Sequence, residues 1–113
     1  MKNYLRVFKA LSDKSRLRIM KMLEVEPMCV CEITDVLNLA PSTVSKHLSL
    51  LHEAELIEDR KEARWVNYSL PGKSLIPFVS EMLKLLRRSL NDDPEVLADM
   101  EKAKKVDRVE LCR

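Results

Sequence analysis

The amino-terminal part of the chain has apolar residues at helical spacing. The first stripe runs from Tyr4 to Leu11 and predicts a helix over residues 3–11. A second stripe, between residues 17 and 23, predicts another helix with Ser12 as its N-cap, and Pro27 breaks the chain after it. The other side of that helix carries basic residues that we expect to face water or phosphate, namely Lys14, Arg18 and Lys21.

Two further helical segments follow each other closely. A short one ends near Asn38, a residue that tolerates the left-handed conformation of a C-cap, and its inner side is formed by Ile33, Val36 and Leu37. The next begins at Pro41, because proline suits the first helical position, and its core side is formed by Val44, Leu48 and Leu51. Two helices joined by so short a turn predict a helix-turn-helix.

The outer face of the second helix of this pair is small and polar near its amino end. Hydroxyl side chains can hydrogen-bond either base edges or phosphates, and the helix dipole favours phosphates at this end. We therefore expect the helix to enter the major groove of DNA. The candidate contacts are Ser42, Thr43, Ser45, Lys46 and His47.

Two strand-like runs, residues 56–60 and 65–70, follow the recognition helix. Residues 61–64 would form the tip between them, and a hairpin placed after a helix-turn-helix makes a winged helix. Its candidate DNA contacts are Arg60, Lys61 and Arg64. Acidic residues outnumber basic ones between residues 38 and 68, so we expect DNA affinity to draw also on Lys14, Arg16 or Arg18.

The carboxy-terminal part predicts a long amphipathic helix over residues 74–90 and a last, polar helix over 95–105. The fold class is therefore mainly α with a small β-hairpin. We expect residues 1–90 to form the winged helix-turn-helix DNA-binding and dimerisation domain, and residues 91–113 to form a polar helix and tail. The apolar stripes of the first helix and of 74–90 exceed what a small core needs, so pairing them across a twofold axis predicts a homodimer.

Composition narrows the class of protein. The chain has 113 residues and a formal net charge of +2, too small by itself to indicate nucleic-acid binding. No apolar run has the roughly 18 residues that a membrane span needs, and no apolar segment follows the basic start of the chain, so we expect a cytoplasmic protein without membrane contact. No general base is identifiable near the cysteines and no cofactor motif occurs, so we expect no enzyme.

Two of the three cysteines, Cys29 and Cys31, lie one residue apart just upstream of the recognition helix. In a reducing compartment this spacing suggests soft-metal binding or redox chemistry, whereas the purely structural alternative is two small, half-buried apolar residues. Residues two apart on a helix project about 200° from each other, so the pair cannot hold one ion while both are helical. Binding should therefore distort the start of the third helix, which supports the recognition helix.

The sequence resembles the arsenical-resistance repressors of the ArsR/SmtB family of winged-helix metalloregulators. The resemblance covers roughly residues 5–70 and is carried by the second helix, residues 11–19, by the Cys-Val-Cys-Glu run at 29–32, and by the recognition helix and wing, residues 50–68. It implies a homodimer that binds double-stranded operator DNA without a cofactor. It also implies that arsenite or antimonite acts as the inducer, binding the thiolates and releasing the DNA.

The chain departs from that family pattern at two positions. Thr34 stands where the best-known members have a third cysteine, and Ala63 stands in the wing turn where related sequences often have glycine. The candidates for the third ligand are Cys112, from the same chain or its partner, and a small cellular thiol.

Other regulatory functions stay open. One alternative is a sensor of cadmium, lead or another thiophilic cation, and another is a thiol redox switch. A zinc site like the one that some family members carry on their last helix is not expected, because residues 74–90 contain no histidine and only Glu81 as an acid. We expect His47 to be a DNA or surface contact rather than a metal ligand.

Overall fold

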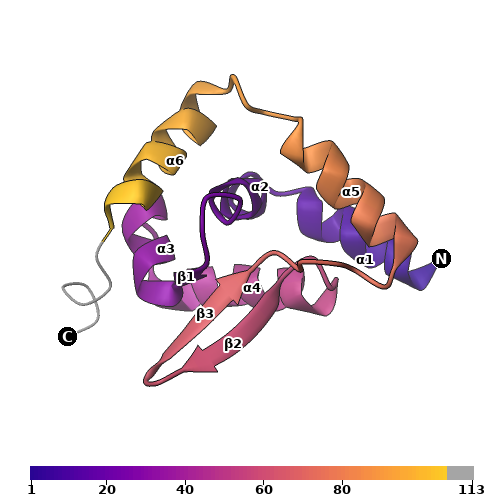
Figure 1. The fold of residues 1–113 in the computed structure, drawn as a ribbon, viewed down its shortest axis with the longest axis horizontal. Coiled ribbons are helices and arrows are strands. Elements are labelled where there is room, and N and C mark those ends of the chain that lie inside the picture. The colour runs from indigo at the N-terminus through magenta and orange to yellow at the C-terminus, as the bar shows by residue number, and fades with distance from the viewer. Residues whose placement is uncertain (107–113) are drawn as a thin grey trace.

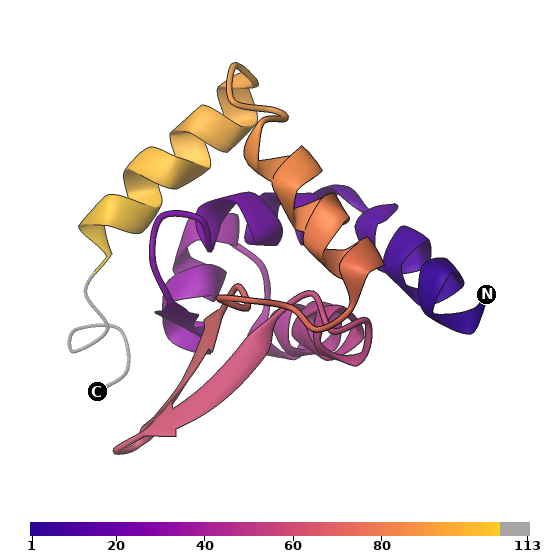
Figure 2. The ribbon, with the colours of Figure 1, turned by 45° about the vertical axis from the view of Figure 1, so that its right-hand side comes forward.

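The computed structural model describes residues 1–106, and within them the chain forms six helices and one small sheet (Figure 1). The helices are α1 (Lys2–Leu11), α2 (Lys14–Met22), α3 (Val30–Leu37), α4 (Pro41–Glu53), α5 (Pro77–Arg87) and α6 (Pro94–Lys105). The strands are β1 (Met28–Cys29), β2 (Glu58–Glu62) and β3 (Trp65–Ser69). Helices α1 to α4 surround the core, and the β2–β3 hairpin projects away from it (Figure 2).

The helix-turn-helix is confirmed. Helix α3 ends at Asn38, whose φ of 56° is the left-handed C-cap conformation, and α4 starts with Pro41 in its first turn. The predicted inner residues of both helices are buried in one cluster, namely Ile33, Val36, Leu37, Val44, Leu48 and Leu51. This shared core fixes the angle at which α4 presents its outer face.

The wing is confirmed, with strand bounds that differ from the predicted ones. Leu56 and Ile57 were predicted in the first strand, but both are buried in the core and β2 begins only at Glu58. Pairing continues to Glu62 opposite Trp65, so the turn is shorter than the predicted four-residue tip. Ala63 in this turn has a φ of 54°, the left-handed conformation that favours glycine.

A third strand was not predicted. Met28 and Cys29 form β1, which pairs antiparallel with β3 and gives the strand order β1-β3-β2. The pairing places Met28 opposite Tyr68 and Cys29 opposite Asn67. The segment before the helix-turn-helix is therefore joined directly to the wing.

Helix α5 is shorter than the predicted helix over 74–90. It begins at Pro77, because proline disfavours helical conformation in the residue before it, and Ile76 is extended. Leu75, which the apolar pattern placed on the helix, lies outside it and is 95% exposed. The helix ends at Arg87, three residues before the predicted end.

The basic side of α2 faces water only in part: Lys14 is exposed, as predicted, whereas Lys21 is not. Lys21 is fully buried, and its Nζ donates to Glu24 Oε1 at 2.9 Å, to the Leu86 carbonyl at 2.7 Å and to Asn91 Oδ1 at 3.0 Å. The N-cap is Asp13 rather than Ser12, because the Asp13 carboxylate accepts the Arg16 N–H at 3.0 Å. The lysine therefore ties α2 to the end of α5.

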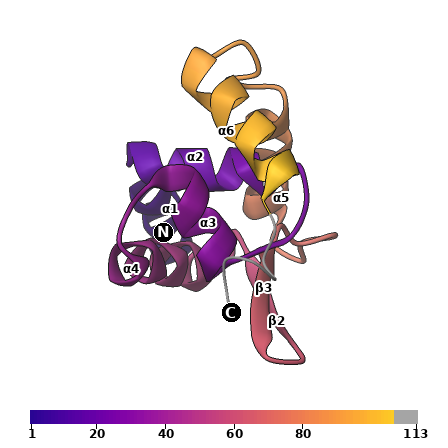
Figure 3. The same ribbon diagram turned by 90° about the vertical axis from the view of Figure 1, so that its left-hand side faces the viewer.

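Helix α6 packs against α2 and α3 (Figure 3). Arg18 of α2 forms a two-pronged pair with the buried Asp99 of α6, with distances of 2.7 Å and 2.9 Å. Val96 and Ala103 are buried as well, so one side of this helix belongs to the core. The boundary at residue 90 stays a prediction. No helix within residues 1–106 is long and apolar enough to cross a membrane.

Candidate DNA-binding surface and thiol site

The outer face of α4 presents the predicted small polar residues together. Ser42, Thr43, Ser45 and Lys46 are all exposed, whereas Val44 and Leu48 between and beyond them are buried. No acidic residue lies in the first turn of α4, so its amide groups and dipole offer a surface suited to an anion. The arrangement fits the phosphate and base contacts expected of a recognition helix.

His47 is placed differently from its neighbours on α4. Its ring is mostly buried, with Nδ1 3.1 Å from Arg16 Nη1 and 4.0 Å from an Asp13 carboxylate oxygen. Burial works against ionisation of Asp13, but the Arg16 N–H, the Arg16 charge and His47 together keep the pKa of Asp13 below its usual value. The contact joins the Arg16 guanidinium to the imidazole ring of His47. His47 therefore joins α4 to α2 in this structure.

The predicted cations of the wing are all exposed, but they do not share one face. Arg60 is opposite Asn67 and Lys61 is opposite Val66, so the two cations project from opposite faces of the hairpin. Arg64, at the turn, lies 4.8 Å from the centre of the Trp65 ring, a cation–π arrangement that restricts its motion. Arg64 is thus the cation held at the tip.

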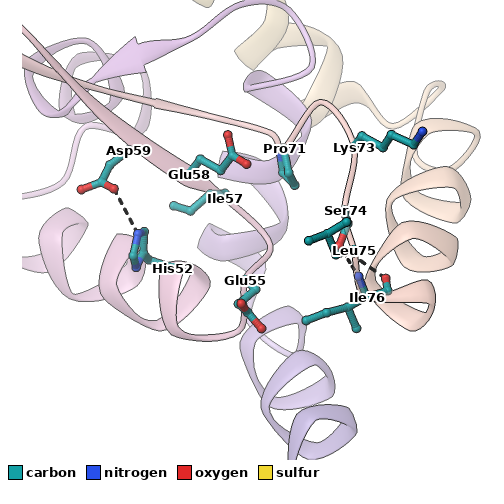
Figure 4. Close-up of a pocket in the computed structure, with 10 residues that line it drawn as sticks. All are labelled: His52, Glu55, Ile57, Glu58, Asp59, Pro71, Lys73, Ser74, Leu75 and Ile76. Carbon is teal, nitrogen blue, oxygen red and sulfur yellow. Dashed lines mark hydrogen bonds and ion pairs between the residues drawn. The ribbon is translucent and has the colours of Figure 1, made fainter.

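A groove lies between the end of α4, the base of the wing and the segment 71–76 (Figure 4). It is lined by three carboxylates, Glu55, Glu58 and Asp59, against one cation, Lys73, so its charge opposes binding of phosphate. His52 Nε2 lies 3.1 Å from Asp59 Oδ1 and joins α4 to β2 across it. The surface suited to DNA is therefore the outer face of α4 and the wing tip, rather than this groove.

The thiol motif lies where β1 passes into α3. Cys29 was predicted at the start of a regular helix, which is wrong: it is the extended N-cap residue, with φ −90° and ψ 170°, and only Cys31 is helical. The 200° separation expected for two helical residues therefore does not apply. Because Cys29 lies before the helix, the two side chains can approach each other without unwinding α3.

Glu32 fixes the conformation of Cys29. A carboxylate oxygen of Glu32 accepts the Cys29 N–H at 2.9 Å, and the Cys29 side chain receives the Glu32 N–H, so the two residues form a capping box with sulfur in place of the usual hydroxyl. Burial is the main cause that raises the pKa of the Cys29 thiol above its usual value, and the Glu32 charge adds to it. Cys29 is therefore a protonated thiol at neutral pH.

The other predicted ligands differ in position. Cys31 is half-buried in the first turn of α3, and its sulfur is disulfide-bonded, so it becomes a ligand only after reduction. Thr34 donates its hydroxyl to the Cys31 carbonyl at 2.8 Å, so it is already satisfied within the helix. Cys112 lies outside the described residues. Within residues 1–106 no three His, Cys, Asp or Glu side chains are placed to hold one ion.

One polar residue at this site was missed from the sequence. Asn67 is 6% exposed, and its Oδ1 is buried without a hydrogen-bond partner. It lies directly opposite Cys29 in the β1–β3 pair. A polar residue in an alternating strand carries no signal of its own, and its role is visible only because β1 pairs with β3.

Comparisons with known proteins agree with this architecture. Residues 13–59 match the model of the family described as "Bacterial regulatory protein, arsR family". The chain is 40% identical over 67 residues to the "Arsenical resistance operon repressor" of Escherichia coli (strain K12), a match that covers 58% of this chain and 57% of that protein. It is 41% identical over 77 residues to the "Cadmium resistance transcriptional regulatory protein CadC homolog" of Staphylococcus aureus, covering 67% and 64%.

Among solved structures, "HlyU from Vibrio cholerae N16961" superposes with a TM-score of 0.64 at 33% identity, covering 77% of this chain and 90% of that one. The chain spans less than two thirds of the two curated relatives named above. The matched region nevertheless contains the helix-turn-helix. The chain belongs to the ArsR family of bacterial regulatory proteins, which are helix-turn-helix transcriptional regulators and not enzymes.

Proposed function

We propose that this chain is a homodimeric transcriptional repressor that binds operator DNA and releases it when arsenite or antimonite binds Cys29 and Cys31. The observation that carries the proposal is the position of the thiol motif. Cys29 belongs to β1, which pairs with the wing, and it caps α3, which packs against α4. A ligand held by both sulfurs therefore acts on the supports of both DNA-binding elements.

The chemistry of the ligand fits thiols. Trivalent arsenic is a soft acceptor that favours sulfur over oxygen and nitrogen donors. Binding at the start of α3 changes the capping box formed by Cys29 and Glu32, and with it the position of the first turn. If the ligand favours a conformation that fits DNA poorly, it lowers the affinity for DNA. Bound DNA then lowers the affinity for the ligand by the same factor.

The DNA surface of the proposal comprises the outer face of α4 and the wing. Its residues are Ser42, Thr43, Ser45, Lys46, His47, Arg60, Lys61 and Arg64. His47 acts through its link to Arg16 and Asp13, which holds α4 against α2. No cofactor is needed for DNA binding, and the place of action is the cytoplasm.

The proposed dimer uses α1 and α5, which lie side by side (Figures 1 and 2). Tyr4 and Phe78 stack with ring centres 4.1 Å apart, and Phe8 meets Phe78 edge-on at 5.4 Å. Tyr4, Leu5 and Phe8 remain about half exposed. A second copy would cover this apolar surface and place two recognition helices on successive major grooves.

The third position on the metalloid has two candidate sulfur donors. Cys112 is the only other thiol in the sequence, and it would serve within one chain or across the dimer. A small cellular thiol would serve equally well in a cell.

The test is operator binding by fluorescence anisotropy with the protein reduced by a phosphine, which, unlike a dithiol, does not compete for arsenic. Arsenite, antimonite, cadmium, zinc and peroxide are titrated against the wild type and against Cys29→Ser, Cys31→Ser and Cys112→Ser. We expect arsenite to release DNA from the wild type, and Cys29→Ser and Cys31→Ser to retain DNA at the same concentration. An arsenite response that persists in Cys31→Ser would place the site elsewhere.

Two other outcomes identify the alternatives. Release by cadmium and not by arsenite would make the protein a sensor of a thiophilic cation. Release only by peroxide would make it a redox switch, an alternative favoured by the disulfide-bonded state of Cys31. Insensitivity of DNA binding to arsenite removes the main proposal in either case.

A further inference from the structure

The three cations expected to supplement the charge of the recognition helix and wing are engaged elsewhere. Lys14 Nζ lies 2.9 Å from Glu95 Oε1, and Arg18 is paired with Asp99, so both side chains lie toward α6. Arg16 donates its Nε to a carbonyl of α1 at 2.7 Å and contacts α4 through another nitrogen. Other cations are therefore needed to offset the acidic residues near the proposed DNA surface.

Helix α1 carries two exposed cations beside α4. A groove between the two helices is lined by Arg6 and Lys9 of α1 and by Leu50 and Glu53 of α4. Both cations are exposed, and within residues 1–106 neither forms a salt bridge. We infer that Arg6 and Lys9 bind phosphates of the operator, as a third DNA contact besides α4 and the wing. This inference rests on the proposed DNA-binding dimer and not on its response to arsenite.

The groove continues the proposed DNA surface of α4. Leu50 lines this groove and also a neighbouring hollow, whose other lining residues are Ser45, Lys46 and Ser49. Three of these residues were already assigned to the outer, polar face of α4. Lys46 and the two cations of α1 therefore lie along one continuous strip of surface, with Leu50 between them.

The two sides of α1 have different partners. Residues three positions apart lie on the same side of a helix, so Arg6 and Lys9 project together toward α4. Tyr4 and Phe8 lie on another side, where both contact Phe78 of α5. Helix α1 thus contacts α4 as well as α5 (Figure 1). Its cations can bind DNA without disturbing the apolar surface proposed for the dimer.

The position of α1 gives the contact a place on the operator. In the proposed dimer α1 forms part of the interface, so its cations lie between the two recognition helices. When these helices occupy successive major grooves, the minor groove between them faces the protein. Arg6 and Lys9 of both chains therefore face the phosphates of this central minor groove. The carboxylate of Glu53 opposes phosphate in the same groove of the protein, and the two cations offset its charge.

The experiment measures how operator affinity depends on salt, by fluorescence anisotropy with the full chain. The α1 variant, Arg6→Ala with Lys9→Ala, removes two cations from each chain of the dimer. Each phosphate contact contributes about 0.9 to the slope of log affinity against log salt, so we expect the slope to fall by about 3 to 4. An unchanged slope would overturn the inference.

The matched control is Lys102→Ala with Lys105→Ala. It removes the same charge from two exposed positions, also three apart, on α6, which packs against α2 and α3. We expect its slope to equal that of the wild type. An equal decrease in the control and in the α1 variant would overturn the inference, because the effect would then come from net charge alone.

Ethylation interference locates the contact on the DNA. Ethylation removes the charge of a phosphate, so at the central minor groove it should weaken operator binding by the wild type and by the α6 control. It should have no effect at these phosphates on binding by the α1 variant. Interference that persists there in the α1 variant would overturn the inference in favour of another residue.

Sedimentation equilibrium separates this inference from the proposed function. We expect the α1 variant to remain a dimer, since it keeps Tyr4, Leu5 and Phe8. A monomeric α1 variant would overturn the inference, because its lower affinity would then come from lost dimerisation. If the wild type binds the operator as a dimer and the α1 variant has the wild-type slope, only the inference fails. If the wild type does not bind operator DNA, the proposed function fails and the inference fails with it.

Discussion

At the residue scale, the thiol pair is defined by its surroundings more than by its spacing. Cys29 and Cys31 would look alike in sequence, but one is an extended, buried cap and the other is half-buried in the first turn of α3. Burial keeps Cys29 in its thiol form at neutral pH, because it raises the pKa of that thiol. The protonation state of Cys29 should therefore affect the binding of arsenite and of cadmium differently.

The pH dependence of binding should differ between arsenite and cadmium. A divalent cation displaces one proton from each thiol, so we expect cadmium to bind about 100-fold more tightly per pH unit below the thiol pKa values. Arsenite forms water with the thiol protons and releases none, so its dissociation constant should be flat between about pH 6 and 8. It should weaken above the raised pKa of Cys29, where a thiolate must first take up a proton.

The measurement is calorimetry in phosphine-reduced samples, in buffers of different ionisation enthalpy, which counts protons directly. Proton uptake on arsenite binding near neutral pH would mean that Cys29 is already a thiolate, and proton release would mean that arsenite binds by a different reaction.

Arg18 gives a second residue-scale prediction. It was expected to contact phosphate, yet it is paired with Asp99, which is 3% exposed. Arg18→Ala leaves that carboxylate buried without its partner, so we expect a loss of about 3–5 kcal/mol in the free energy of unfolding. Lys14→Ala, which removes the exposed pair with Glu95, should cost less than about 1 kcal/mol.

Urea denaturation measures both changes. Under conditions in which the Arg18→Ala variant stays folded, its operator affinity should depend on salt as the wild-type affinity does. A shallower salt slope with unchanged stability would instead assign Arg18 to the phosphate backbone.

At the element scale, the two proposed DNA-binding elements share supports. Helix α4 is held by the α3 core, by the His47–Arg16 contact with α2 and by the His52–Asp59 pair with β2. The hairpin is held by β1 as well as by α4. Much of the proposed DNA surface is therefore positioned by contacts between elements, while its charge comes from a few exposed cations.

Lys46 on α4 is the cation that tests the orientation of the recognition helix. If it contacts phosphate in each half of a dimer, Lys46→Ala should reduce the slope of log affinity against log salt by about two, since each phosphate contact contributes about 0.9. Lys84→Ala is the matched control, because Lys84 is an exposed lysine on α5, away from the proposed DNA surface. Equal slopes for Lys46→Ala and the wild type would exclude a phosphate contact at this position.

At the scale of the whole molecule, the exposed apolar surface on α1 and α5 remains without a cover in one chain. Leu5 is 61% and Phe8 is 54% exposed, next to the aromatic contact with Phe78. A charge placed there costs little in the monomer and opposes burial in a dimer. This difference makes the proposed interface testable.

Leu5→Glu combined with Phe8→Glu should shift the protein from dimer to monomer in sedimentation equilibrium and lower operator affinity by at least about tenfold, because twofold binding doubles the phosphate contacts. Leu75→Glu is the control, since Leu75 is 95% exposed and lies outside α5. If the double variant stays dimeric with wild-type DNA affinity, the dimer uses another surface.

The sequence by itself determined the elements whose signals are local. Apolar periodicity and Pro41 located the helix-turn-helix, Asn38 marked the end of α3, and the alternating residues of β3 predicted the wing. These features depend on neighbours a few positions away, so they can be recognised from the sequence alone. The thiol motif was visible for the same reason.

The tertiary structure decided whatever depends on partners far along the chain. Lys21 and Arg18 were predicted to be surface cations. They are instead paired with acceptors at the end of α5 and on α6, which lie too far along the chain for a local pattern to show. The two-residue strand β1 is too short to show a period, and it exists because β3 offers its edge. That pairing moved Cys29 out of the helix and placed Asn67 beside it, since register joins residues that no local pattern connects.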